Sequence, residues 1–285
     1  MGKFLQILAL LFFLSIPFSL KGQPQTIVDK LVREYRPNSY WLTLRYDQYF
    51  KSGSFFFIEN NNRFQKDADY LLNSFFLNSM HRTFLMAGYE YKAAEKWYVG
   101  ISGKYILDAN RNQPNNRYFY TRANISHRGN FLKMKFIKEI ALEHNNKLNK
   151  PDNPAVFIQN EGRFSFAPAL VKKINIVERP LFIILNYRAF IFFDFNNDGF
   201  SPYNKRKFDK TELRFELDYR ISNKVLLSLF AIRDTDYSYR IASYDMNMNV
   251  IKEEARVNYV TPTFGLSINL TIDAPEDFIP GFPIK

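Results

Sequence analysis

The sequence of 285 residues contains no cysteine, only 11 glycines and only 3 histidines. The absence of cysteine excludes disulfide bonds, a thiolate zinc site, a cysteine nucleophile and a lipid-modified N-terminal cysteine. The scarcity of histidine argues against a metal centre with several imidazole ligands. Long apolar runs are also missing after Gln23, because the richest segment, residues 180–193, contains Asn186 and Arg188. A membrane-spanning helix needs about 20 mostly apolar residues, so none is expected there.

Residues 1–22 have the pattern of a secretory signal peptide, with Lys3, an apolar stretch at 4–20 and a small residue, Gly22, at the end. The stretch is short for a membrane anchor and is interrupted by polar residues. Cleavage would lower the formal charge of +11 to +9 by removing two lysines. The expected organisation is a signal peptide over 1–22, an N-terminal segment over 23–39, a barrel over 40–273 and a tail over 274–285.

Apolar and polar residues alternate along most of the remaining chain. In Leu213–Ile221 (LRFELDYRI), every second residue is apolar and those between them are charged. Strand side chains alternate between faces, so such a strand has one apolar and one charged face. Similar segments predict strands at 41–50, 54–64, 82–92, 97–107, 117–127, 133–143, 156–166, 181–194, 213–221, 225–239 and 263–272.

Short turns and long polar links alternate between these strands, which is typical of an outer-membrane barrel. Aromatic residues reach 18% of the chain, and several lie near strand ends, where they suit the two membrane interfaces. They are Trp41, Tyr89, Tyr91, Trp97, Phe119, Tyr187, Phe193, Tyr219 and Tyr237.

We therefore expect an all-β fold, a closed antiparallel up-and-down transmembrane barrel. Bacterial barrels usually have an even number of strands, so we expect 12, with 10 as the alternative. The additional strand is sought at 70–77, or in a division of 253–272 near Pro262. Apolar residues at helical spacing in 24–36 predict a short helix before the barrel.

At this level the chain resembles the uncharacterised outer-membrane β-barrel families of Gram-negative bacteria. The resemblance is carried by RTFLMAGYEYKAAEKWYVGISGKY (Arg82–Tyr105), a strand, a short turn and a second strand that begins with Trp97. It implies outer-membrane localisation and insertion by the barrel-assembly machinery, and it brings no catalytic residues. In such families the last strand usually ends on an aromatic residue, whereas here it ends near Ile272.

The charged strand faces are expected to line the lumen, which would be either a narrow polar channel or a space filled by paired side chains. A barrel of about 12 strands is much smaller than the 16–18-stranded porins, which favours the filled lumen. The predicted lumen-lining residues are Arg45, Glu59, Arg63, Glu90, Arg122, Lys133, Lys135, Glu161, Arg163, Arg188, Arg214, Glu216, Asp218 and Arg220.

Two weaker motifs are also present. Ser79 and His81 are two residues apart on a predicted strand, as a lipid-acting hydrolase would need, but no third orienting residue accompanies them. Asp194, Asn196 and Asp198 precede Gly199 as in a calcium loop, but the position of the usual bidentate Glu is occupied by Lys205. An exposed Asn-Asp-Gly turn is the simpler interpretation of this second motif.

Basic and acidic residues are interspersed, so no nucleic-acid-binding face is expected. The expected partners are outer-membrane lipid and lipopolysaccharide, and no cofactor is expected. The function predicted from the sequence is an outer-membrane barrel with a structural or narrow-channel role. A barrel hydrolase and a soluble periplasmic ligand-binding β-protein are the alternatives.

Overall fold

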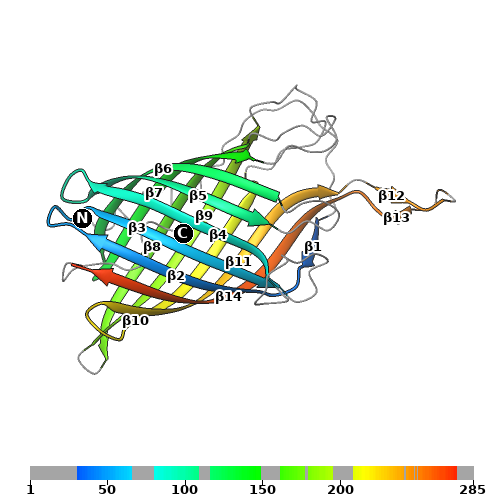
Figure 1. Cartoon of the computed structure of the whole chain (residues 1–285). Coiled ribbons are helices and arrows are strands. Elements are labelled where there is room, and N and C mark those ends of the chain that lie inside the picture. The colour runs from blue at the N-terminus through cyan, green and yellow to red at the C-terminus, as the bar shows by residue number, and fades with distance from the viewer. Residues whose placement is uncertain are drawn as a thin grey trace, which may run out of the picture.

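A computed structural model describes residues 31–65, 80–108, 116–148, 161–176, 179–194, 208–240, 242–246, 248 and 250–274. All regular elements in these ranges are strands (Figure 1). They are β1 (Leu31–Tyr35), β2 (Ser39–Tyr49), β3 (Phe55–Gln65), β4 (Met80–Lys92), β5 (Trp97–Asp108), β6 (Asn116–Phe131), β7 (Met134–Lys147), β8 (Glu161–Ile176), β9 (Arg179–Asp194), β10 (Lys210–Arg220), β11 (Val225–Arg240), β12 (Ser243–Tyr244), β13 (Val250–Lys252) and β14 (Ala255–Ile272).

Strands β2 to β11 and β14 form a closed barrel in sequence order, and β14 pairs with β2 to complete it. The predicted all-β barrel is therefore confirmed, and its sheet contains 12 strands, the expected number. Within the described residues, however, β1 lies outside the ring, so eleven strands close it. The closing pair, β14 with β2, is parallel, whereas the sequence predicts antiparallel pairing throughout.

The region of β1 corrects two further expectations. Residues 31–35 are a strand paired in parallel with β14, and not part of a helix over 24–36. Residues 255–272 form one strand that continues through Pro262, and not two. On this edge, β1 pairs with Arg256–Val260 and β2 begins opposite Thr263, so Pro262 lies where β14 has no partner on that side. A proline is tolerated there because no neighbouring strand needs its missing N–H.

The two rims of the barrel differ. Short connections at 50–54, 93–96, 132–133 and 221–224 mark one end, named here the turn rim. The opposite end, the loop rim, is where β3, β5 and β7 end and where β2 and β14 begin. At the turn rim, the positive φ angles of Gly53, Leu132 and Lys133 allow the chain to reverse tightly.

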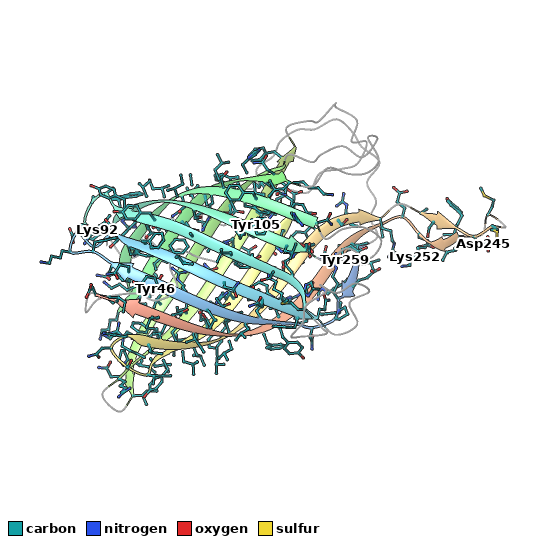
Figure 2. The ribbon with its side chains drawn as sticks, viewed as in Figure 1. Tyr46, Lys92, Tyr105, Asp245, Lys252 and Tyr259 are labelled. Atoms are coloured by element: carbon teal, nitrogen blue, oxygen red, sulfur yellow. The ribbon has the colours of Figure 1, made fainter. Side chains whose placement is uncertain are left out.

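A two-stranded ribbon extends beyond the loop rim. Strands β11 and β14 remain paired as far as Arg240 and Ala255, and the small hairpin of β12 and β13 continues from them (Figure 1). Asp245 and Lys252 lie on this hairpin, well away from the barrel wall, whereas Lys92 lies at the turn rim (Figure 2).

Candidate functional site: a vestibule above a closed floor

The interior of the barrel contains a cavity of about 890 Å³, named here the vestibule. It reaches the loop rim, where Arg36, Gln65 and Asp236 line it. The deepest side chain that each barrel strand contributes to it lies near the middle of most strands, whereas Arg163 is the third residue of β8. These are Thr43, Glu59, Met86, Ser102, Arg122, Glu143, Arg163, Asn186, Arg214, Ile232 and Thr263.

On every strand, the next inward-facing residue toward the turn rim does not line the vestibule. These residues form a row around the inside of the barrel, which we name the floor. Eight strands place buried side chains in the floor, namely Arg45, Phe57, Asn124, Ala141, Ser165, Ile184, Glu216 and Phe230. The other three strands have Gly88, Gly100 and Gly265 there. A side chain at Gly88 would collide with the Phe57 ring, and one at Gly265 would collide with the Phe230 ring. Because Gly88 and Gly265 have no side chain, the rings of Phe57 and Phe230 can pack against the backbone at these positions.

Ion pairs hold the charged part of the floor together. The Arg45 guanidinium donates to Asp47 Oδ1 at 2.8 Å and to Glu59 Oε2 at 3.4 Å. On β10, Arg214 donates to Glu216 Oε2 at 2.7 Å. Buried charges are tolerated when they are paired and hydrogen-bonded, which is the arrangement found here.

A second set of ion pairs crosses from strand to strand at the level of the floor. Arg122 pairs with Glu139 and with Glu143, whose Oε1 lies 3.3 Å from Arg122 Nε. Arg128 pairs with Glu90 nearer the turn rim. All three carboxylates are buried. Glu90 and Glu139 do not line the vestibule, and a water-filled channel would expose them, so their burial indicates that the lumen is filled below the vestibule.

Apolar side chains fill the interior between the floor and the turn rim on one side of the barrel. Ile137, Ala167, Ala169, Val171, Phe182, Ile184 and Leu226 form one buried cluster there. A second cluster, with Tyr49, Phe55 and Phe57, includes a stacked ring pair in which the Tyr49 and Phe55 centroids are 4.9 Å apart. Part of the turn-rim half of the lumen is therefore closely packed with apolar side chains.

The vestibule walls differ in charge. On β10 and β11, Lys210 lies among Glu212, Asp234 and Asp236, within ion-pair distance of all three carboxylates. On the wall from β3 to β8, Arg63, Lys104 and Arg163 lie over aromatic rings. The vestibule thus has an acidic side and a cationic, aromatic side.

The outer surface is apolar on all eleven barrel strands. Each carries at least one exposed large apolar or aromatic side chain, for example Leu44, Ile58, Leu85, Ile101, Ile125, Leu142, Phe166, Leu185, Phe215, Leu229 and Ile268. These side chains form the outer belt. Tyr46 and Tyr105 project from the wall on the outside (Figure 2). A belt of this size is far larger than the apolar patches of ordinary soluble monomers.

Asn60 and Asn62 are polar residues on the outer surface, among the apolar side chains of this belt. Asn60 Nδ2 donates to the Phe84 carbonyl oxygen at 3.3 Å, and Asn62 Nδ2 donates to Asn60 Oδ1 at 2.8 Å. The Thr83 hydroxyl donates to Asn62 Oδ1 at 2.8 Å. The polar groups thus bond to one another along the wall, which reduces the cost of placing them on an apolar surface.

The structure places the predicted lumen-lining residues as follows. Arg63, Arg122, Arg163, Arg188 and Arg214 line the vestibule, as does Glu59. Arg45, Glu90, Glu216 and Asp218 are buried at or below the floor. Lys135 and Arg220 are partly exposed near the turn rim, and the Glu161 side chain lies outside the described residues. Lys133 is a correction, because it is exposed in the tight turn between β6 and β7, where its φ is positive.

Trp41 is a second correction. Its place near a strand end suggests the outer surface, but the ring lies inside, with the Arg63 Cζ 3.8 Å from its centroid. The parity of β2 would have located it, because Trp41 is two residues from Thr43 and four from Arg45, which both face inward. Phe84, Tyr120 and Phe192 are further inward aromatic residues that the sequence reasoning did not identify.

His81 lines the vestibule near the loop rim, while Ser79 lies outside the described residues. The pairing of β3 with β4 shifts between Arg63 and Phe64, whose partners are Arg82 and Met80, so His81 is bulged out of the register. Its Nδ1 has no hydrogen-bond partner among the described residues. A catalytic histidine normally donates from this atom to an orienting carboxylate, and that bond is not formed here.

The calcium motif falls mainly outside the described residues. Asn196 and Asp198 lie beyond them, as does the side chain of Asp194, whose backbone ends β9. Within the described ranges, no group of three or more His, Asp or Glu residues is arranged to hold a metal ion.

No family model, curated protein or solved structure matches this chain. In the part of the chain that the structure describes, no helix is long and apolar enough to span a membrane.

Proposed function

We propose that the chain is an integral outer-membrane β-barrel with a vestibule that opens at the loop rim and a lumen that is closed at the floor. In this proposal the protein has a structural or solute-binding role and is not a through-channel. It resembles the uncharacterised outer-membrane barrels noted from the sequence. The observation that carries the proposal is the outer belt, which surrounds the closed barrel on every strand.

The reversal of the usual arrangement of a soluble protein supports a membrane environment. Side chains such as Glu59, Glu139 and Asp218 are buried inside, while Ile101 and Leu229 are more than half exposed outside. In water this would leave the apolar surface hydrated and bury charge. In a bilayer the same arrangement is favourable, because lipid covers the belt and the closed ring leaves no unpaired edge in the hydrocarbon.

The distribution of aromatic residues agrees with two membrane interfaces. Tyr91 and Trp97 are exposed beside the short turn that joins β4 to β5. Tyr105 and Phe119 are exposed near the loop rim and are register partners across β5 and β6. Aromatic girdles at both ends of the apolar band are a property of outer-membrane barrels.

The floor supports a closed lumen. It lies across the barrel, and the interior beneath it is filled by apolar side chains and by buried charged side chains such as Glu90 and Asp218. Barrels of 16–18 strands leave an aqueous channel, whereas a ring of eleven strands has an interior that side chains can fill.

Expression of the full chain in a Gram-negative host, followed by membrane fractionation, tests this proposal. We expect the protein in the outer-membrane fraction, resistant to extraction by alkaline carbonate and extractable by detergent. A resident outer-membrane porin and a soluble periplasmic protein serve as markers. Recovery of the chain in the soluble fraction after carbonate washing would overturn the membrane assignment and favour a periplasmic ligand-binding protein.

A further inference from the structure

We propose that the cationic wall of the vestibule binds a small, water-soluble organic anion with two or more negative charges, such as a phosphate monoester. The site consists of Arg63, Lys104 and Arg163, held by the rings of Trp41, Phe84, Tyr120 and Phe192. This inference extends the proposed function, because it assigns a ligand class to the vestibule of the barrel.

Cations and aromatic rings alternate along this wall, forming what we name the cation ladder. Arg63 Cζ lies 3.8 Å from the Trp41 centroid and 5.3 Å from the Phe84 centroid. The Lys104 ammonium lies 5.5 Å from the centroid of the same Phe84 ring. One ring on β4 therefore positions two cations, one from each of its neighbouring strands, β3 and β5.

The ladder continues across the next strands. Lys104 Nζ and Arg163 Cζ each lie 5.0 Å from the Tyr120 centroid, and Arg163 Cζ lies 4.7 Å from the Phe192 centroid. Arg163 Nη2 also donates to the Tyr120 hydroxyl at 3.3 Å. All these side chains line the same cavity, so the three positive groups share one space.

Arg63 and Lys104 are held differently from Arg45, which lies in the floor, and from Arg214, which lies directly above it. Arg45 and Arg214 make direct ion pairs with carboxylates. Within the described residues, neither Arg63 nor Lys104 has a carboxylate at ion-pair distance, and aromatic faces occupy that place instead. A ring face attracts a cation without neutralising its charge. Arg63 and Lys104 therefore keep their positive charge, and an anion can approach them without breaking an ion pair of either residue.

The opposite wall restricts the ligand further. Glu212, Asp234 and Asp236 surround Lys210 there and would repel a ligand that is anionic at both ends. A molecule with its negative charge at one end and hydroxyl groups at the other suits both walls. The volume of about 890 Å³ lies within the usual size of small-molecule sites, ~300–1,000 Å³.

The chain provides its own reporter for this site, because it contains only two tryptophans and one of them is Trp41. Trp97→Phe removes the other, which lies on the outer surface. The test titrates this full-length mature variant, purified in an uncharged detergent, with glucose 6-phosphate. An anion that draws Arg63 away from the indole should change Trp41 emission in a saturable way, and calorimetry provides an independent affinity.

Arg63→Gln and Lys104→Gln should each weaken binding at least about tenfold, since a charge-assisted hydrogen bond is worth ~1.5–3 kcal/mol. Arg63→Lys should retain most of the affinity, because it keeps the charge. Lys133→Gln is the matched control, since it removes one positive charge from an exposed turn at the other rim. Glucose, which lacks the phosphate, should give no saturable change.

Three results would overturn the proposal. They are the absence of saturable binding by the folded protein, equal binding by Arg63→Gln and Lys133→Gln, or a response only in micelles that contain phosphatidic acid, which would indicate a lipid headgroup. The circular dichroism spectrum confirms that each variant is folded. These results are separate from the fractionation test, because a carbonate-soluble protein can be titrated without detergent, and a membrane barrel can fail to bind the anion.

Discussion

Thr43 of β2 and Ser267 of β14 are register partners in a parallel pair, and both side chains are buried inside the barrel. This pair closes the ring. Because β2 and β14 run in the same direction, the barrel begins at the loop rim with Ser39 and ends at the turn rim with Ile272. An even-stranded antiparallel barrel would instead begin and end at the same rim.

The proposed outer-membrane location predicts that the two rims are accessible from opposite sides of the membrane. The cysteine-free sequence allows single-cysteine variants to report on this directly. Met246→Cys, on the exposed hairpin beyond the loop rim, should react with a membrane-impermeant maleimide in intact cells, since long loops usually face outward. Asn223→Cys, in a short exposed turn at the other rim, should react only after the outer membrane is permeabilised. Equal labelling of both variants in intact cells would contradict this orientation.

Buried and exposed ion pairs should differ strongly in their contribution to stability. Arg122→Ala would leave the buried carboxylates of Glu139 and Glu143 without this partner, which should lower the free energy of unfolding by about 3–5 kcal/mol. Arg36→Ala removes a pair with Asp236 in which both side chains are at least one-third exposed, and should cost less than about 1 kcal/mol. Urea unfolding in detergent micelles measures both changes, and similar costs for the two variants would argue against a closed, water-excluding floor.

Gly265 should be intolerant of any side chain. A Cβ at this position would overlap the Phe230 ring, so Gly265→Ala should destabilise the barrel by about 1–3 kcal/mol. Adding Phe230→Leu should restore part of the loss, because it removes the overlapping ring atoms. Gly103→Ala is the matched control, since its Cβ would meet only the Phe119 ring at 3.2 Å. The prediction fails if the Gly103 and Gly265 variants melt at the same temperature, or if the second substitution gives no recovery.

The wild-type barrel should not conduct ions in planar bilayers, because the floor closes its lumen. Phe57→Ala combined with Phe230→Ala removes two floor rings and should produce reproducible conductance steps. The rings of Phe57 and Phe230 also support Arg45 and Arg214, whose Cζ atoms lie 4.6 and 3.9 Å from the respective centroids. Leu229→Ala, on the outer surface next to Phe230, is the control and should stay silent. Regular single-channel steps from the wild type would show that the floor does not seal the lumen.

Much of the fold follows from alternation along single strands. In Leu213–Ile221 every second residue is apolar, and the structure places Leu213 and Phe215 outside and Arg214 and Glu216 inside. This pattern is local, because side-chain direction in a strand depends only on parity. In less regular strands, single large residues give a weaker signal. The aromatic character of Trp41 predicts the outer surface, whereas the parity of its neighbours predicts the inner face on which the structure places it.

The sequence by itself determined that this chain forms alternating strands joined by short turns on one side, with apolar and charged faces, because these properties depend on neighbouring residues. Only the tertiary structure decided how the ring closes, since the pairing of β14 with β2 joins residues more than 200 positions apart and its direction leaves no local signature. The same holds for the floor and the cation ladder. Their members come from many strands, and only the register of the closed barrel brings Arg63, Lys104 and Arg163 into one cavity.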